Sequence, residues 1–354
     1  MKLAFARLAR ARAPCIRSVR TFSTTATRFQ SPVHSIPYTE SCPAPTCACA
    51  STPADLDIDR KTPLLNTMAP YAEQVLICTG KEDWTSKLED EGGATGEFVK
   101  GLKGVIGKGG PAFDPFTNIL VTASSLPASP SPETSTTAYL LPSFLRIPNI
   151  PHTPTAFTAL ASAYLKPTSL HPLHAALSPT QKAALLRDAS QSALLPPAET
   201  ITHPLILICG HGGRDARCGV LGPLLQRAFR AELKRRGIAA EVAQISHIGG
   251  HKFAGNVVVY VPGGWRARAR ARAEGEGEES GVSALQGCGI WYGRVGPAQV
   301  EGLVEETLVR GRVVGELLRG GVVRGAAGAG AAGGGDIGRR IEAQRRAARA
   351  RAGA

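Results

Sequence analysis

Long apolar runs are missing from this chain. No segment approaches the roughly 18–20 consecutive apolar residues of a membrane-spanning helix, so we expect no membrane span. Cysteine is sparse, with eight in 354 residues, and no secretory signal is present, which excludes a secreted disulfide scaffold. Twin C-x9-C pairs, the pattern of intermembrane-space disulfide proteins, are also absent. The length still allows two domains with a sizeable core.

Acidic residues are missing from the first 39 positions, which carry seven basic residues. This start is rich in Arg, Ser and Thr, and Leu3, Phe5 and Leu8 can form one apolar helical face. The pattern predicts a mitochondrial transit peptide over residues 1–30, with an unstructured basic tail as the alternative. We therefore expect a mitochondrial protein, located in the matrix, where cysteines stay reduced.

A basic stripe on the folded part is missing as well. The net charge is +13, but most of it lies in the two ends, and about +1 remains for the body between them. The basic run at 266–272 is followed by an acidic run at 274–279, so these charges cancel. A nucleic-acid partner is therefore not expected.

Composition divides the rest of the chain into four parts. Residues 31–62 form a Pro/Cys-rich linker, and a first domain is predicted at 63–195. A second domain is predicted at 201–318. A Gly/Ala-rich basic tail at 319–354 is expected to be disordered.

The first domain has alternating strand and helix patterns. Strands are predicted at 74–80, 118–126 and 138–147, the last at a sheet edge because Pro142 interrupts it. A helix is expected to start near Thr85 as N-cap, and two more are predicted at 155–165 and 178–194. In the last helix, Ser178 is the expected cap and Pro179 the first helical residue.

The second domain shows a β-α-β-β-α order. Its strands are predicted at 204–209, 240–246, 256–261 and 289–295. Its helices are predicted at 221–237, which ends at Gly237, and at 297–311. The insertion at 264–286 should extend a hairpin. This order is typical of a thioredoxin-like α/β domain with a functional loop after its first strand.

A short internal similarity links the two domains. QVLICTG (74–80) and LILICG (205–210) both place a cysteine at the end of the opening strand. The first domain is therefore either a degenerate copy of the second or similar by chance. Lys87 occupies the position where a second cysteine would stand.

A cysteine pair and a histidine pair carry the predicted chemistry. Cys209 and Cys218 bracket a glycine-rich loop with C-x8-C spacing, and His247 and His251 follow with H-x3-H spacing. Two thiolates and two imidazoles form a complete ligand set for a soft or borderline metal centre. Glycines in both loops allow tight turns that direct N–H groups at sulfur.

Other interpretations of these four residues stay open at this point. A structural zinc site fits H-x3-H but not the usual C-x2–4-C spacing. A dithiol redox pair would normally have C-x-x-C spacing. In a purely structural role, Cys209 is a buried strand residue and the histidines are hydrogen-bonded in a turn.

Three motifs in the second domain resemble the thioredoxin-like ferredoxins, and within them the fungal sucrase/ferredoxin-like group. They are CGHGGRDARCG (209–219), HIGGHKFAGNVVVY (247–260) and WYGRV (291–295). CPAPTC (42–47), NTMAPY (66–71) and ICTGKEDW (77–84) extend the similarity to about residues 40–320. The charged run at 266–279 and the Gly/Ala-rich tail depart from the family pattern.

This resemblance implies a [2Fe–2S] cluster held by Cys209, Cys218, His247 and His251. Replacing two thiolates by imidazoles removes negative charge, which implies a raised reduction potential. The implied function is single-electron transfer to an unknown redox partner protein, in thiol redox quality control. The alternatives are a structural zinc-binding scaffold without redox activity and a thiol oxidoreductase. A carboxylate pair suited to glycoside hydrolysis is not evident.

Several further residues are weaker candidates. His211 and Arg214 lie inside the ligand loop and are either neighbours of the metal centre or ordinary loop residues. Trp291 and Tyr292 are expected in the core rather than at an electron exit. A second metal on the linker cysteines is less favoured, because a Pro-rich linker is a poor cage; its ligands would be Cys42, Cys47, Cys49 and Cys78.

Overall fold

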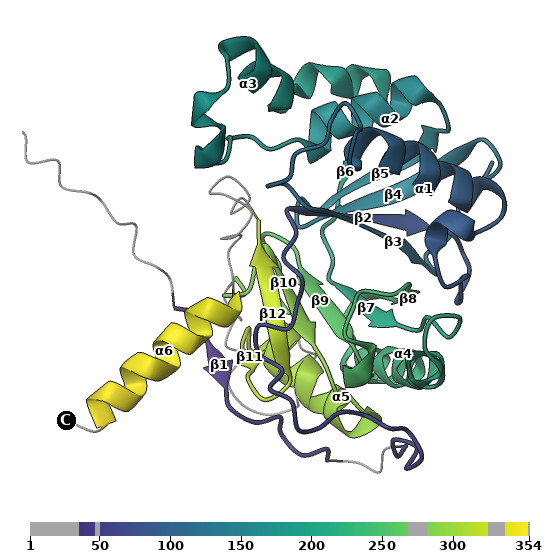
Figure 1. Cartoon of the computed structure of the whole chain (residues 1–354). Coiled ribbons are helices and arrows are strands. Elements are labelled where there is room, and N and C mark those ends of the chain that lie inside the picture. Colours follow the sequence, from purple (N-terminus) through teal and green to yellow (C-terminus); the bar gives the residue numbers. More distant parts are fainter. Residues whose placement is uncertain (1–34, 47–49, 268–281, 325–336, 353–354) are drawn as a thin grey trace, which may run out of the picture. The chain divides into compact units, whose positions relative to one another are not determined.

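A ten-stranded mixed sheet runs through both halves of the chain (Figure 1), in the order β12-β10-β9-β7-β8-β3-β2-β4-β5-β6. The computed structural model describes residues 35–46, 50–267, 282–324 and 337–352. The predicted transit peptide (1–30), Cys47, Cys49 and residues 268–281 of the charged insertion lie outside these ranges. The described part belongs to one compact unit, Ser35–Ala354.

The strands of the sheet fall into two sets. The N-terminal set is β2 (Glu73–Cys78), β3 (Ile119–Ser124), β4 (Ser135–Leu141), β5 (Leu145–Pro151) and β6 (Glu199–Thr200). The C-terminal set is β7 (Leu205–Cys209), β8 (Glu241–Ile245), β9 (Val257–Val261), β10 (Cys288–Tyr292) and β12 (Leu318–Val323). A separate two-stranded sheet pairs β1 (Tyr38–Thr39) with β11 (Val313–Val314).

Helices cover this sheet and complete a mixed α/β fold, as the sequence predicted. They are α1 (Gly93–Ile106), α2 (Pro154–Leu160), α3 (Pro179–Leu185), α4 (Ala216–Arg236), α5 (Pro297–Leu303) and α6 (Ile337–Ala352). The helix α4 packs against β7, β8 and α5, and α1 packs against α2 and β4 (Figure 1). Every residue of β7 and β9 is buried, as expected for central strands whose two faces are both covered.

The two halves repeat the same connections. In the N-terminal half, β2 pairs in parallel with β3 and antiparallel with β4, which pairs with β5. In the C-terminal half, β7 pairs in parallel with β8 and antiparallel with β9, which pairs with β10. Cys78 ends β2 as Cys209 ends β7, which fits the hypothesis of a degenerate copy.

The two sets of strands join at the centre of the sheet. Strands β3 and β8 are antiparallel neighbours, paired at Ser124 and Ile245. Neighbouring hydrogen bonds strengthen the joint: Ser246 N–H donates to the Ala123 carbonyl, and Ser125 N–H to the Gln244 carbonyl. The regions predicted as separate domains at 63–195 and 201–318 therefore share one hydrogen-bonded sheet.

Three local predictions in the N-terminal half are wrong. The helix predicted at 178–194 ends at Leu185, and a separate 3-10 helix follows at Ala189–Leu194. The stretch 138–147 is not one edge strand but parts of β4 and β5, with the cis Leu141–Pro142 bond at the turn between them. Thr85 caps no helix, because its N–H and hydroxyl both bind the Glu91 carboxylate, and α1 begins only at Gly93. By contrast, the Ser178 cap and the left-handed Gly237 at the end of α4 are confirmed.

The C-terminal region is more ordered than its composition indicates. The predicted disordered tail, 319–354, contains most of β12 and all of α6 (Figure 1). Ile337 and Ile341 of α6 are fully buried. Gly321 suggested flexibility, yet a Cβ there would lie 2.7 Å from Ile337 Cδ1. Glycine is therefore what lets α6 approach β12. Within the described ranges, no helix is both long and apolar enough to span a bilayer.

Candidate metal centre

The two predicted cysteine ligands meet where β7 ends and α4 begins. Cys209 is the last residue of β7 and Cys218 the third residue of α4, and both are buried. The helix starts five residues earlier than predicted, because the Asp215 side chain accepts a hydrogen bond from Arg217 N–H as an N-cap. Cys218 therefore lies in the first helical turn, not at the end of a loop.

The thiols of Cys209 and Cys218 share a hydrogen bond that shifts their pKa values in opposite directions. The pKa of Cys209 is lowered well below its usual value, first by the hydrogen bond from Cys218 and then by the His247 ring and the His211 N–H. The pKa of Cys218 is raised, first by its bond to Cys209 and then by burial. The surroundings of Cys209 thus favour a negatively charged sulfur.

The two histidines lie beside one another on the loop after β8. Their ring centroids are 5.4 Å apart, and the His247 side chain also hydrogen-bonds Cys209. Gly249 and Gly250 between them have φ of +82° and +72°, a left-handed conformation that favours glycine and excludes a regular helix here. The loop expected from the sequence is therefore present, and it brings the histidine pair to the cysteine pair.

His251 offers a nitrogen without a protein partner. Its Nδ1 is buried and accepts or donates no hydrogen bond within the described part of the chain. Its Nε2 lies 4.0 Å from Asp215 Oδ2, and its side chain is 44% exposed. A metal-bound imidazole typically has its other nitrogen near a carboxylate, which is the environment that Asp215 provides.

The N-terminal half holds the ligand loop in place. The Asp83 carboxylate accepts hydrogen bonds from Gly213 N–H at 3.0 and 3.1 Å. The fully buried His211 ring binds the carbonyl oxygens of Trp84 and Thr85 through Nε2, at 3.0 and 2.9 Å. Its Nδ1 accepts a hydrogen bond from His247 N–H at 2.9 Å. His211 is therefore a neighbour of the candidate ligands, one of the two roles weighed for it.

A buried arginine places positive charge beside the thiols. Arg319 is 1% exposed and interacts electrostatically with Cys209 and Cys218. Its guanidinium donates to the carbonyls of Gly249 and Thr67 at 3.0 and 2.9 Å, and no carboxylate pairs with it in the described ranges. Burial lowers the pKa of Arg319 to about 10. A buried cation with only neutral partners indicates that negative charge belongs next to it.

Sequence reasoning missed Arg319 and Asp83. Both act from segments remote from the C-x8-C and H-x3-H motifs, and neither has a distinctive spacing. The ICTGKEDW similarity (77–84) includes Asp83 and was the one available signal. Arg319 lay in the segment predicted as tail.

The candidate ligands lie as two pairs, Cys209 with Cys218 and His247 with His251. In the described part of the chain, no three His, Cys, Asp or Glu side chains converge on one point. A mononuclear zinc site needs four donors around one ion, whereas a [2Fe–2S] cluster takes two donors on each iron. One thiol pair beside one imidazole pair is the second arrangement.

The remaining aromatic and loop candidates have structural partners. Trp291 is buried and donates from Nε1 to the Tyr71 hydroxyl at 3.1 Å. Tyr292 shares a 2.8 Å hydrogen bond with Thr307, so both aromatic residues belong to the core, as predicted. Arg214 donates to Ser86 Oγ at 3.0 Å across the two halves.

Among the described residues, Cys42 and Cys78 are not gathered into a second metal group. Cys42 Sγ contacts the Gln299 carbonyl near α5, whereas Cys78 ends β2 beside Ser124. Burial raises the pKa of both thiols to about 12. Where the structure is described, the linker cysteine and Cys78 thus face different surroundings.

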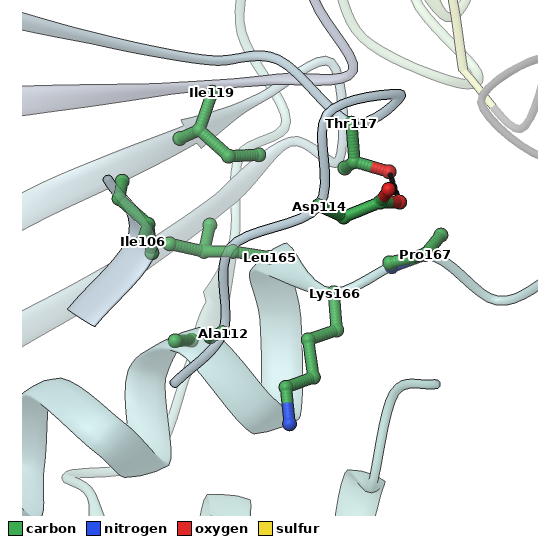
Figure 2. Close-up of a pocket in the computed structure, with 9 residues that line it drawn as sticks. Ile106, Ala112, Asp114, Thr117, Ile119, Leu165, Lys166 and Pro167 are labelled. Atoms are coloured by element: carbon green, nitrogen blue, oxygen red, sulfur yellow. Dashed lines mark hydrogen bonds between the residues drawn. The ribbon is translucent and has the colours of Figure 1, made fainter. Parts of the chain in front are cut away.

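A small cavity in the N-terminal half is unrelated to the ligands (Figure 2). Its volume is about 10 Å³, enough for one water molecule. The nearby Asp114 carboxylate already accepts hydrogen bonds from Thr117 Oγ1 at 2.7 Å and from Phe116 N–H at 3.1 Å. We assign this cavity to packing.

Comparison with known proteins adds relatives and a family. The chain is 36% identical over 156 residues to altered inheritance of mitochondria protein 32 of Meyerozyma guilliermondii, covering 44% of this chain and 45% of that relative. It is 40% identical over 121 residues to the protein of the same name in Debaryomyces hansenii, covering 34% and 37%. The alignments thus span less than half of each relative, and no solved structure matches. The sucrase/ferredoxin-like family model matches residues 64–320, which contain all four candidate ligands, and the chain belongs to that family.

Proposed function

We propose that this protein is a one-electron carrier that holds a [2Fe–2S] cluster on Cys209, Cys218, His247 and His251. The observation that carries the proposal is the pair of hydrogen-bonded thiols, which meets the pair of imidazoles through the contact of His247 with Cys209. When bound, such a cluster would accept and release single electrons at a potential raised by its neutral histidine ligands.

The protein's own groups suit an anionic centre at this place. The His211 N–H already donates to the Cys209 sulfur, and Arg319 supplies buried positive charge. Both features stabilise negative charge on sulfur and favour the uptake of an electron. The exposed side of His251 would be the route to a partner, since the cysteines are buried.

The relatives' name and the Arg-rich first 30 residues support a mitochondrial location, which we place in the matrix. There the protein would exchange electrons with a redox partner protein in thiol redox quality control. A cluster protein with buried ligand cysteines would support this role by electron transfer and not by direct dithiol exchange.

Visible absorption of the purified protein, and EPR after reduction, test the proposal. We expect a coloured protein with the rhombic signal of a [2Fe–2S] centre and about two irons per chain. His247→Ala and His251→Ala should bleach it, whereas His247→Cys should keep the colour and lower the reduction potential. His171→Ala, on a partly exposed histidine of the N-terminal half that is not one of the four proposed ligands, is the matched control.

Two results would overturn the proposal. A colourless protein with one zinc per chain would favour the structural scaffold. If both alanine variants kept the wild-type spectrum, the histidines would not be ligands.

A further inference from the structure

A cavity of about 290 Å³ opens beside His247, between the ligand loops and the N-terminal half. Its lining includes His211 and His247 from the ligand loops and the segment from Ser86 to Glu89 from the N-terminal half. Ligand pockets for small molecules start at about this volume. The cavity is distinct from the four proposed ligands, of which only His247 contributes to it.

The cavity has unbalanced positive charge. Lys87, Lys103 and Arg214 line it together with a single acid, Glu89, and Glu89 is already paired with Lys103. Neither Lys87 nor Arg214 forms an ion pair with any carboxylate in the described ranges, and Arg214 donates only to the neutral Ser86 hydroxyl. Glu89 also lies close enough to Lys87 for an electrostatic interaction, so the lining carries three cations against one carboxylate.

Part of the cavity lining is apolar. Leu88 and Val121 line it, and Leu88 is buried. A ligand that contacts both the cations and the apolar residues combines an anionic group with an apolar body. A bare inorganic ion would leave the apolar residues in contact with water. A carboxylate matches the planar, multi-donor guanidinium of Arg214.

We propose that this cavity binds a small organic carboxylate with an apolar body, held by Lys87 and Arg214 with its body against Leu88. Its bearing on electron transfer rests on the proposed function: negative charge next to His247 opposes the addition of an electron and lowers the reduction potential. Binding itself requires only the cavity and its charges.

Benzoate is a suitable probe, with benzamide as its uncharged counterpart, titrated into the purified full-length protein by ligand-observed NMR and calorimetry. We expect benzoate to bind and benzamide to bind at least about tenfold more weakly, since a charge-assisted hydrogen bond is lost. Lys87→Gln and Arg214→Gln should each weaken benzoate binding about tenfold. Lys100→Gln, an exposed lysine on the same helix as Lys103, should leave it unchanged.

The outcomes separate this site from the proposed cofactor. Equal affinity for benzoate and benzamide, no saturable benzoate binding, or equal weakening in the Lys100→Gln control would overturn the carboxylate site even in a coloured, EPR-active protein. Saturable benzoate binding that Lys87→Gln weakens would support it even in a colourless one. In the coloured protein, saturating benzoate should shift the reduction potential downward, and an upward shift would contradict the proposed placement beside His247.

Discussion

The Nδ1 atom of His211 accepts a hydrogen bond from the backbone N–H of His247, and the two nitrogens are 2.9 Å apart. Through this contact the loop between the two cysteines fixes the loop that carries the histidines. The same ring reaches the carbonyls of Trp84 and Thr85 from its other nitrogen. One buried imidazole therefore connects both ligand pairs and the N-terminal half, with Nε2 as its donor and Nδ1 as its acceptor.

Variants of His211 should separate these two contacts. In His211→Asn the amide oxygen can replace Nδ1 as acceptor, so His247 should stay in place and the EPR spectrum should remain close to wild type. In His211→Gln the amide nitrogen replaces Nε2, the His247 N–H loses its partner, and the g-values and potential should shift. Both variants should lower the unfolding free energy by about 1–3 kcal/mol, because a buried polar group is left unpaired. Identical spectra for the two variants would contradict this positioning role.

Arg319 should raise the reduction potential through its charge. Arg319→Gln removes a buried cation next to Cys209 and Cys218, and we expect a potential about 50 mV lower or more, which corresponds to about 1 kcal/mol. Arg319→Lys keeps the charge but loses the planar guanidinium donors. This variant should be less stable than wild type, and its reduction potential should change less than that of Arg319→Gln. Redox titration followed by EPR measures both. A potential unchanged in Arg319→Gln would show that the charge has no such effect.

Asp83 should govern how firmly the ligand loop is held. Removing its carboxylate in Asp83→Ala leaves the Gly213 N–H without its acceptor, which costs about 1 kcal/mol at this exposed position. We expect faster loss of colour on incubation with a chelator, monitored by visible absorption. Asp90→Ala, on an exposed aspartate of the same segment, is the control and should bleach at the wild-type rate.

Glu73 should make stability depend on pH. Burial raises the pKa of its carboxyl from 4.5 to about 7, against the lowering effect of its hydrogen bonds from Ser143. Because the folded pKa is the higher one, folding takes up a proton between these values, and stability falls as pH rises from about 4.5 to 7.

Above pH 7 the Glu73 carboxyl is charged in the folded protein, and this lowers the free energy of unfolding by on the order of 3 kcal/mol. Glu73→Gln should therefore be more stable than wild type at pH 8 and similar at pH 4.5, in urea unfolding followed by circular dichroism. Glu133→Gln, at an exposed position, should change neither. A Glu73→Gln variant that is no more stable at pH 8 would mean that the carboxyl stays neutral or is better solvated.

The parts of the site that the sequence predicted are those with local signals. Cys209, Cys218, His247 and His251 combine ligand chemistry with short spacings, and their apolar flanks predict the strands β7 and β8 directly. The predictions at Pro142 and Thr85 were wrong for different reasons. Pro142 lies in a turn between two strands, and Thr85 binds the Glu91 carboxylate instead of capping a helix. The strand β12 was not predicted because its glycines are typical of a disordered tail. In the structure, Gly321 instead allows the close approach of α6.

Arg319 and Asp83 could not be predicted from patterns of this kind. Their roles depend on where the chain returns in space: Arg319 donates to Thr67, and Asp83 binds Gly213. Side chains that support a site from far along the chain have no fixed spacing, so only the tertiary structure identifies them.

The contact between Thr67 and Arg319 joins two distant parts of the chain and has an entropic cost. The two residues are 252 positions apart, and contacts of such separation form late because closing a long loop costs entropy. The cysteine and histidine loops, by contrast, lie within one β-α-β segment and can assemble early. Burying Arg319 beside the thiols therefore carries a loop-closure cost that the pairing of the cysteines with the histidines does not.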